Sequence, residues 1–196
     1  MIELHPGDEL DLVTADGTPL TRLQLGLGWD KERTAGFIGT GAPDIDLDAS
    51  AVQFAGGQLF DLAFYNHLAT RDGSVVHLGD NKTGSGAGDD EAITVDLSKV
   101  HGPVDQIVFV VSSYQGHTLE WVNNAYCRLI AGDQPEGEGE EPVELARLTL
   151  TGGVPETGVV MAKLVRAGDR WRLRAIGSGV RLTKPSDAGA ALARFL

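Results

Sequence analysis

The chain has little cysteine, little aromatic content and only scattered histidine. Cys127 is the single cysteine among 196 residues, so an internal disulfide framework is excluded. It alternates with Ala125 and Leu129, which predicts a buried strand residue rather than a nucleophile. Five dispersed histidines beside one cysteine disfavour zinc. Aromatic residues make up 6 %, which is little for the sugar-stacking cleft of a glycoside hydrolase.

Long apolar runs and an excess of positive charge are also missing. No run approaches the roughly 20 residues of a membrane helix, and no basic segment followed by an apolar one opens the chain, so we expect a cytoplasmic protein. Sixteen Lys and Arg against 28 Asp and Glu give a net charge of −12. That charge repels nucleic acid and anionic lipid as direct partners. It attracts hard cations, unless the acids serve only solubility.

Short apolar or alternating stretches, separated by Gly, Asp or Pro, predict β-strands. They cover 20–27, 47–54, 59–65, 92–97, 106–112, 125–130, 143–150, 159–165 and 171–176. Asp16-Gly17, Gly56-Gly57, Asp72-Gly73 and Gly168-Asp169 are candidate turns. Many short strands without amphipathic helices favour an all-β, antiparallel sandwich of two sheets, one domain over 1–196.

Helix is predicted in two places only, 117–124 and the C-terminal residues 188–196. The acidic, Gly- and Pro-rich segment 133–142 is typical of a mobile loop whose charges are solvated. The tail 180–196 otherwise matches no pattern, and no internal repeat or domain linker is visible.

The first acidic cluster alternates with apolar residues. In an extended segment Asp44, Asp46 and Asp48 lie on one face, with Ile45 and Leu47 on the other. Carboxylates at this spacing repel one another unless a cation lies among them. A solvent-facing edge strand that uses charge against aggregation is the alternative interpretation.

The second cluster begins at Asp80 and Asn81 and ends at Asp89, Asp90 and Glu91. Calcium takes 6–8 oxygen ligands at irregular angles, backbone carbonyls included. Side-chain oxygens at both ends of a loop and glycines between them suit such a shell. Together the two clusters predict a calcium site.

Other sites fit the second cluster less well. Asp80 and Glu91 have the spacing of the first and last EF-hand ligands, but Lys82, Gly84 and Ser85 break the EF-hand pattern. The glycines match neither a phosphate loop nor a dinucleotide-binding turn. A hydrolase has no Gly-x-Ser-x-Gly elbow here, although His67 or His77 could act as a base. A hydrogen-bonded structural role is the alternative for both histidines.

Several motifs resemble the TerD family of tellurium-resistance and stress-response proteins, and its TerZ-like branch most closely. In order along the chain, the motifs are Gly26–Asp30, Ile45–Ser50, Phe64–Asn66, Asp72–Val75, Gly79–Asn81 with Thr83-Gly84, Gly88–Glu91, Val104–Phe109 and Asn124–Leu129. The resemblance extends from about residue 4 to about residue 179. Residues 31–42, 133–142 and the tail after Gly179 depart from it.

The resemblance implies a sandwich whose acidic, glycine-rich loops hold calcium, commonly two ions. The ligands it implies are Asp30, Asp46, Asp48, Asn66, Asp80, Asn81, Asp89, Asp90 and Glu91. It also implies bacterial resistance to tellurite, phage and other stress, in assemblies with other Ter proteins at the inner face of the membrane, and no enzymatic activity. From the residues alone, a metal-dependent hydrolase or small-molecule binder that uses the same acids stays open.

Overall fold

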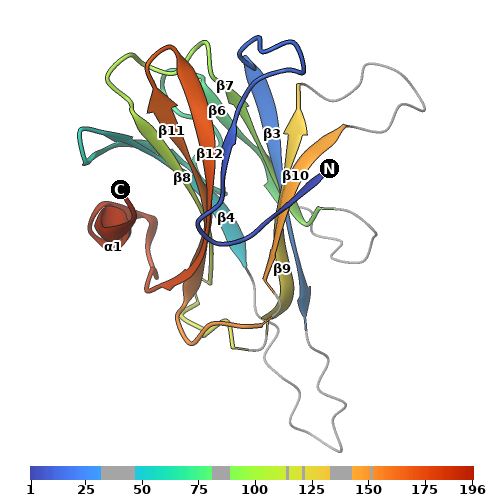
Figure 1. Ribbon diagram of the computed structural model, residues 1–196. Helices are drawn as coiled ribbons and strands as arrows, with labels where there is room; N and C mark the ends of the chain where they lie inside the picture. Colours follow the sequence, from blue (N-terminus) through green and yellow to red (C-terminus); the bar gives the residue numbers. More distant parts are fainter. Residues whose placement is uncertain (32–46, 81–88, 114, 121, 133–142, 151) are drawn as a thin grey trace, which may run out of the picture.

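The chain forms two β-sheets that lie face to face (Figure 1), and apolar and polar residues alternate along many of their strands. The computed structural model describes residues 1–31, 47–80, 89–113, 115–120, 122–132, 143–150 and 152–196, with the side chains of 30, 31, 80 and 123 left out. The strands are β1 (Ile2–Leu4), β2 (Glu9–Asp11), β3 (Arg22–Lys31), β4 (Asp48–Ala55), β5 (Gln58–Ala63), β6 (Val75–Asp80), β7 (Glu91–Asp96), β8 (Gln106–Ser112), β9 (Val122–Ala131), β10 (Glu144–Leu150), β11 (Gly158–Ala167) and β12 (Arg170–Val180).

One sheet has the order β1-β10-β9-β3-β7-β6 and is called the β3 sheet below. The other, the β11 sheet, has the order β2-β12-β11-β8-β4-β5. All pairings between these strands are antiparallel except that of β1 with β10, which is parallel. The expected antiparallel sandwich is therefore confirmed, with one parallel pair at the edge of the β3 sheet.

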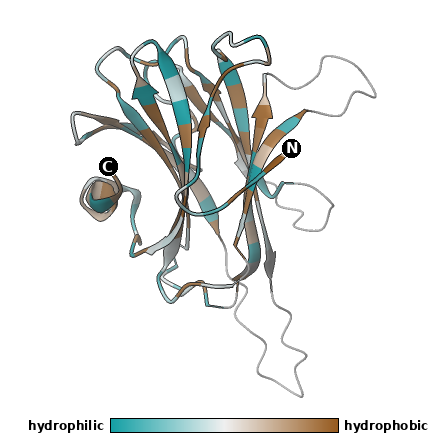
Figure 2. Ribbon diagram, viewed as in Figure 1, coloured by the Kyte–Doolittle hydropathy of each residue, from teal (hydrophilic) through white to brown (hydrophobic). Residues whose placement is uncertain are grey.

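The main core fills the space between the sheets. Leu25 and Ile93 from the β3 sheet and Phe109, Leu164 and Trp171 from the β11 sheet are at most 5 % exposed. Brown and teal alternate along many strands in Figure 2, because successive side chains point to opposite faces. The alternation that predicted strands is the same alternation that fills this core.

A second, smaller core lies on the outer face of the β11 sheet. Val52, Val110 and Val160 point outward there and are covered by Ala188 and Leu192 of the C-terminal segment. That segment consists of η1 (Pro185–Asp187), α1 (Ala188–Leu192) and η2 (Ala193–Phe195), and it lies beside the β11 sheet in Figure 1. Since β4 and β8 are buried on both faces, their sequences are apolar runs rather than clean alternations.

The predicted turns form where glycine is required. Gly56 and Gly57 have φ of 56° and 79° and join β4 to β5 as a two-residue hairpin. The prediction of helix over 117–124 is wrong, because Leu119 is buried in a bridge to Val154 and β9 already begins at Val122. The C-terminal helix is confirmed, as one turn of α-helix flanked by 3₁₀ turns. The expectation for 133–142 lies outside the described residues.

Candidate functional site

Strand register brings acids that are distant in sequence to one end of the sandwich. Asp80 at the end of β6 pairs with Glu91 at the start of β7, and Glu91 pairs with Leu27 of β3. Asp30, three residues farther along β3, pairs with Asn123 of β9. Asp48 opens β4 in the other sheet. The strand ends that carry Asp30, Asp48, Asp80 and Glu91 therefore lie at the same end of the two sheets.

Glu91 links the two sheets at this end. Its side chain points into the sandwich and is 1 % exposed. Oε2 accepts a hydrogen bond from the backbone amide of Ala49, the residue after Asp48. Oε1 is buried, and no partner for it is found in the part of the chain that the structure describes. The two sequence clusters thus meet through Glu91, and one carboxylate oxygen is left without a donor.

His77 is the other buried neighbour of Glu91. Its Nδ1 accepts a hydrogen bond of 3.0 Å from the amide of Gly79, so this nitrogen carries no proton. Nε2 therefore carries the hydrogen and donates it to Oε2 of Glu91 over 3.3 Å. With Nδ1 as acceptor and Nε2 as donor, the imidazole ring orients the Glu91 carboxylate. Of the two expectations for His77, the hydrogen-bonded structural role is the one observed.

Asp89 faces the opposite side of the β3 sheet. Arg128 holds its carboxylate with two hydrogen bonds, Nε to Oδ1 at 2.7 Å and Nη2 to Oδ2 at 3.0 Å. The hydroxyl of Tyr126 donates to Oδ1 over 3.1 Å. Burial and the Asp89 charge raise the pKa of Tyr126 to about 12. The hydrogen bonds that Arg128 donates to Asp89 raise the pKa of Arg128.

Two strand glycines make room for this ion pair. A Cβ on Gly26 would lie 1.9 Å from Oδ2 of Asp89, and one on Gly28 would lie 2.4 Å from the Tyr126 ring. Glycine inside a strand often marks such a close approach. Asp89 was expected from the sequence as a ligand, whereas its partners Arg128 and Tyr126 were not predicted. The two glycines Gly26 and Gly28 in one strand were the sequence signal that large side chains approach the backbone there.

The remaining expected ligands have separate positions. Oδ2 of Asp90 accepts a 2.8 Å hydrogen bond from the amide of Trp29. Asp48 is half-buried at the start of β4, and Asn66 is exposed in the turn between Phe64 and His67. Asp46 and Asn81 lie outside the described residues, as does the expectation for 31–42 beyond its first residue.

The consecutive acids Asp89, Asp90 and Glu91 do not form one cluster. Within the described residues, no three His, Cys, Asp or Glu side chains converge as a group that could hold a metal ion. The bare Oε1 of Glu91 is nevertheless what a calcium ligand provides, because a buried carboxylate oxygen without a donor is costly unless a cation compensates it. The carboxylates that the structure describes at this end, Asp48, Asp90 and Glu91, are the oxygen ligands that calcium prefers.

Asp72, the first residue of the Asp72–Val75 motif, has a structural role as a hydrogen-bond acceptor. Oδ1 accepts hydrogen bonds from the amide and hydroxyl of Ser74 and from Oγ1 of Thr70, at 2.7 to 3.0 Å. Oδ2 accepts from the amide of His101 at 3.0 Å and from Nε2 of Gln53 at 3.3 Å. Partial burial acts to raise its pKa, but the hydrogen bonds outweigh burial and lower it to about 2. Asp72 therefore ties the β5–β6 connection to β4 and to the segment before β8.

Comparisons with known proteins agree with this fold. A family model described as TerD domain matches residues 1–183. The stress response protein SCP2 of Bacillus subtilis (strain 168) is 36 % identical over 199 residues, covering 95 % of this chain and 96 % of that protein. Tellurium resistance protein TerZ of Serratia marcescens is 36 % identical over 185 residues, covering 92 % and 91 %. Tellurium resistance protein TerD of Alcaligenes sp is 38 % identical over 187 residues, covering 91 % and 90 %.

A solved structure shows the same fold. The crystal structure of a homologue of telluride resistance protein (TerD) from Streptomyces coelicolor A3(2) superposes with a TM-score of 0.63 at 21 % identity, covering 87 % of this chain and 95 % of that one. The names of the three sequence relatives denote stress or resistance proteins, and none of them names an enzymatic activity. Among the described residues, no helix is both long and apolar enough to cross a membrane.

Proposed function

Since the chain belongs to the TerD-domain family, we propose that it is a calcium-binding stress-response module of the tellurium-resistance type. The relatives named TerZ and TerD match it to a similar degree, so the family supports the function class rather than one branch. Its role is to change surface or assembly when the ion binds, and not to catalyse a reaction.

One observation carries the metal part of this proposal. Within the described residues, the Glu91 carboxylate is buried between the two sheets, Oε1 has no hydrogen-bond partner, and no Lys or Arg side chain pairs with it. Burial of an anion in this state is unfavourable by several kcal/mol without a counter-charge. A calcium ion at Oε1 supplies that charge.

The ligand set is proposed around Glu91. Asp48 and Asp90 flank it in the two sheets, and Asp30, Asp46, Asp80 and Asn81 belong to the segments that begin or end at the same place. Asp89 stays with Arg128, so we assign it to positioning of the β7 start rather than to the ion. Asn66 is proposed as a ligand on the family resemblance alone. These proposed ligands are numerous enough for two calcium ions.

The wider setting follows from the same family. We propose action in the cytoplasm, with other Ter-type stress proteins as partners and with membrane association through those partners. The rival hypothesis, a metal-dependent hydrolase or small-molecule binder at the same acids, needs a base beside the ion. Both ring nitrogens of His77 are already engaged, Nδ1 by the Gly79 amide and Nε2 by Glu91, which favours the module.

Calorimetry with a matched pair of variants tests the proposal. Glu91→Gln removes the bare carboxylate oxygen, and we expect calcium affinity to fall about tenfold or more. Asp105→Asn is the control, because Asp105 also has a buried oxygen without a described partner but precedes β8 at the other end of the sandwich from Asp48 and Ser112. Both variants are checked by circular dichroism in EDTA. Wild-type calcium affinity in folded Glu91→Gln would refute the assignment.

A further inference from the structure

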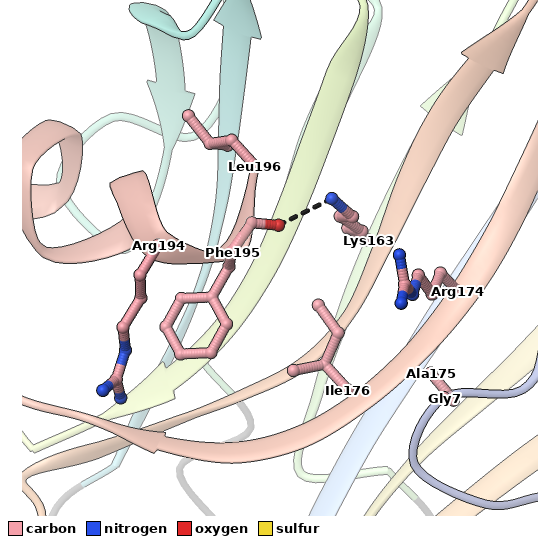
Figure 3. Close-up of a pocket in the computed structure, with 8 residues that line it drawn as sticks. All are labelled: Gly7, Lys163, Arg174, Ala175, Ile176, Arg194, Phe195 and Leu196. Carbon is pink, nitrogen blue, oxygen red and sulfur yellow. Dashed lines mark hydrogen bonds between the residues drawn. The ribbon is translucent and has the colours of Figure 1, made fainter.

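The outer face of the β11 sheet and the C-terminal segment enclose a cavity of about 260 Å³. Figure 3 shows Lys163 of β11 and Arg174 and Ile176 of β12 on one side, with Arg194 and Phe195 on the other. The residues of the C-terminal wall lie beyond position 183, where the match to the family model ends. The cavity is also distinct from Glu91, which lies between the sheets.

Lys163 is a buried cation for which the described residues show hydrogen bonds to neutral groups but no ion pair. It is 5 % exposed, and Nζ donates to Oε1 of Gln106 at 2.7 Å and to the carbonyl of Phe195 at 2.6 Å (Figure 3). An ammonium has three hydrogens, and the described residues supply only these two acceptors, both of them neutral. Burial and the charge of Arg174 lower the pKa of Lys163, and they outweigh the opposite effect of Glu9 and Asp105.

Arg174 adds a second cation next to Lys163. The two residues are direct partners in the pairing of β11 with β12. The described residues give the Arg174 guanidinium one ion pair, a long one, with Nε 3.9 Å from Oε1 of Glu9. Like charges placed opposite each other across strands are unfavourable unless an anion lies between them. Arg194 also lines the cavity, but its guanidinium donates to the carbonyl of Gly179, so Lys163 and Arg174 are the two adjacent cations there, in a chain of net charge −12.

The rest of the lining is apolar. Ile176 contributes an apolar surface from the sheet and the Phe195 ring contributes one from the C-terminal segment, and the Arg194 guanidinium lies 4.7 Å from the centre of that ring. An ammonium and a guanidinium side by side match the several oxygens and the double negative charge of a phosphate better than a single carboxylate. The volume of about 260 Å³ accommodates a phosphate with a small organic group beside it.

We propose that this cavity binds the phosphate group of a small phosphate monoester, with Lys163 and Arg174 on the phosphate oxygens and Phe195 against the organic part. The site needs no calcium, because its cations contact the anion directly. It gives the chain a ligand-binding function beyond the calcium site proposed above. It also ties the C-terminal segment to ligand binding, since the same Lys163 ammonium holds the Phe195 carbonyl.

Phenyl phosphate is the probe, titrated into the full chain by calorimetry and two-dimensional NMR, with EDTA present so that calcium cannot carry the phosphate. We expect saturable binding, with shifts centred on Lys163, Arg174 and Phe195. Lys163→Met and Arg174→Gln should each weaken it about tenfold or more, because each removes a charge-assisted hydrogen bond. Arg174 is half-exposed, so its variant keeps the fold even if loss of Lys163 does not.

Arg172→Gln is the matched control. Arg172 lies on the same strand two residues away and is fully paired, with Nε 2.7 Å from Asp11 and Nη1 2.9 Å from Glu9. Its loss should leave phenyl phosphate binding unchanged. Equal weakening by all three variants, or benzoate bound as tightly as phenyl phosphate, would overturn the site. Binding that depends on Lys163 only with vesicles of phosphatidylcholine and phosphatidate would place the phosphate on a lipid and overturn the small-molecule assignment.

Discussion

Replacement of Asp72 by Asn tests how far one carboxylate stabilises the connection between the sheets. The carboxylate accepts five hydrogen bonds, from Thr70, Ser74, His101 and Gln53. An asparagine keeps one acceptor oxygen and turns an NH₂ group toward the donors on the other side. If the NH₂ group takes the place of Oδ2, the hydrogen bonds from Gln53 and His101 are both lost, and these two donors then face the NH₂ group, which is itself a donor.

The expected cost follows from the pKa. A shift from 3.8 in the unfolded chain to about 2 in the folded protein corresponds to about 2 kcal/mol of stability at neutral pH. Donors left without an acceptor add about 1 kcal/mol. We therefore expect Asp72→Asn to lower the free energy of unfolding by about 3 kcal/mol and the thermal midpoint by about 6–12 °C.

The pH dependence gives a second signature. Because the folded pKa lies below the unfolded one, the stabilisation is complete above about pH 5 and is lost progressively as pH falls through the folded pKa of about 2. Urea denaturation of wild type and Asp72→Asn, both in EDTA, should therefore show two curves that approach each other across this range. Asp16→Asn is the control, since Asp16 closes a similar Asp-Gly turn without reaching another segment. Parallel curves, or a loss below about 1 kcal/mol at pH 7, would refute the reasoning.

Four further outcomes are expected. Calorimetry in excess magnesium should still show calcium binding, on the order of micromolar or tighter, because flexible oxygen ligands suit the larger ion; equal competition by magnesium would contradict this. Removal of calcium by EDTA should lower the thermal midpoint by several degrees, since about a hundredfold excess over Kd adds about 2.7 kcal/mol; an unchanged melting curve would mean that the acids are ordinary solvated side chains. Asp48→Asn and Asp90→Asn should each weaken calcium binding, and the double variant should lose less than the sum if they share an ion, whereas additive losses indicate separate sites. Gly26→Ala should lower the midpoint in a denaturation assay by breaking the Asp89–Arg128 pair, while Gly102→Ala, whose Cβ meets nothing within 4 Å, should not.

Alternation predicted most of the sandwich because it reports burial directly. The stretch 106–112 is β8 to the residue, and the Gly56-Gly57 hairpin follows from its conformational requirement. β6 was missed because Gly79 and the acids after it favour a loop, whereas pairing with β7 extends the strand to Asp80. β1 and β2 have three residues each, too few for a periodic pattern.

The sequence identified the acidic residues of the candidate site, but it did not show which groups each of them contacts. Asp89, Asp90 and Glu91 are adjacent in sequence, yet they contact Arg128, Trp29 and Ala49 respectively. Sequence position cannot show that Arg128 neutralises Asp89, since the two are brought together only when β9 pairs with β3. The cavity at Lys163 had no signal at all, because a single lysine in an apolar strand gains its meaning from Arg174 and Phe195 after folding.

We propose that Oε1 of Glu91, which has no partner among the described residues, is a calcium ligand. Anomalous diffraction from crystals grown with terbium, a calcium substitute that prefers the same oxygen ligands, tests it most directly. We expect a peak at about 2.3–2.6 Å from Oε1 of Glu91, the range of calcium–oxygen bonds. Terbium bound elsewhere in crystals whose Glu91 Oε1 still has no partner would contradict the account.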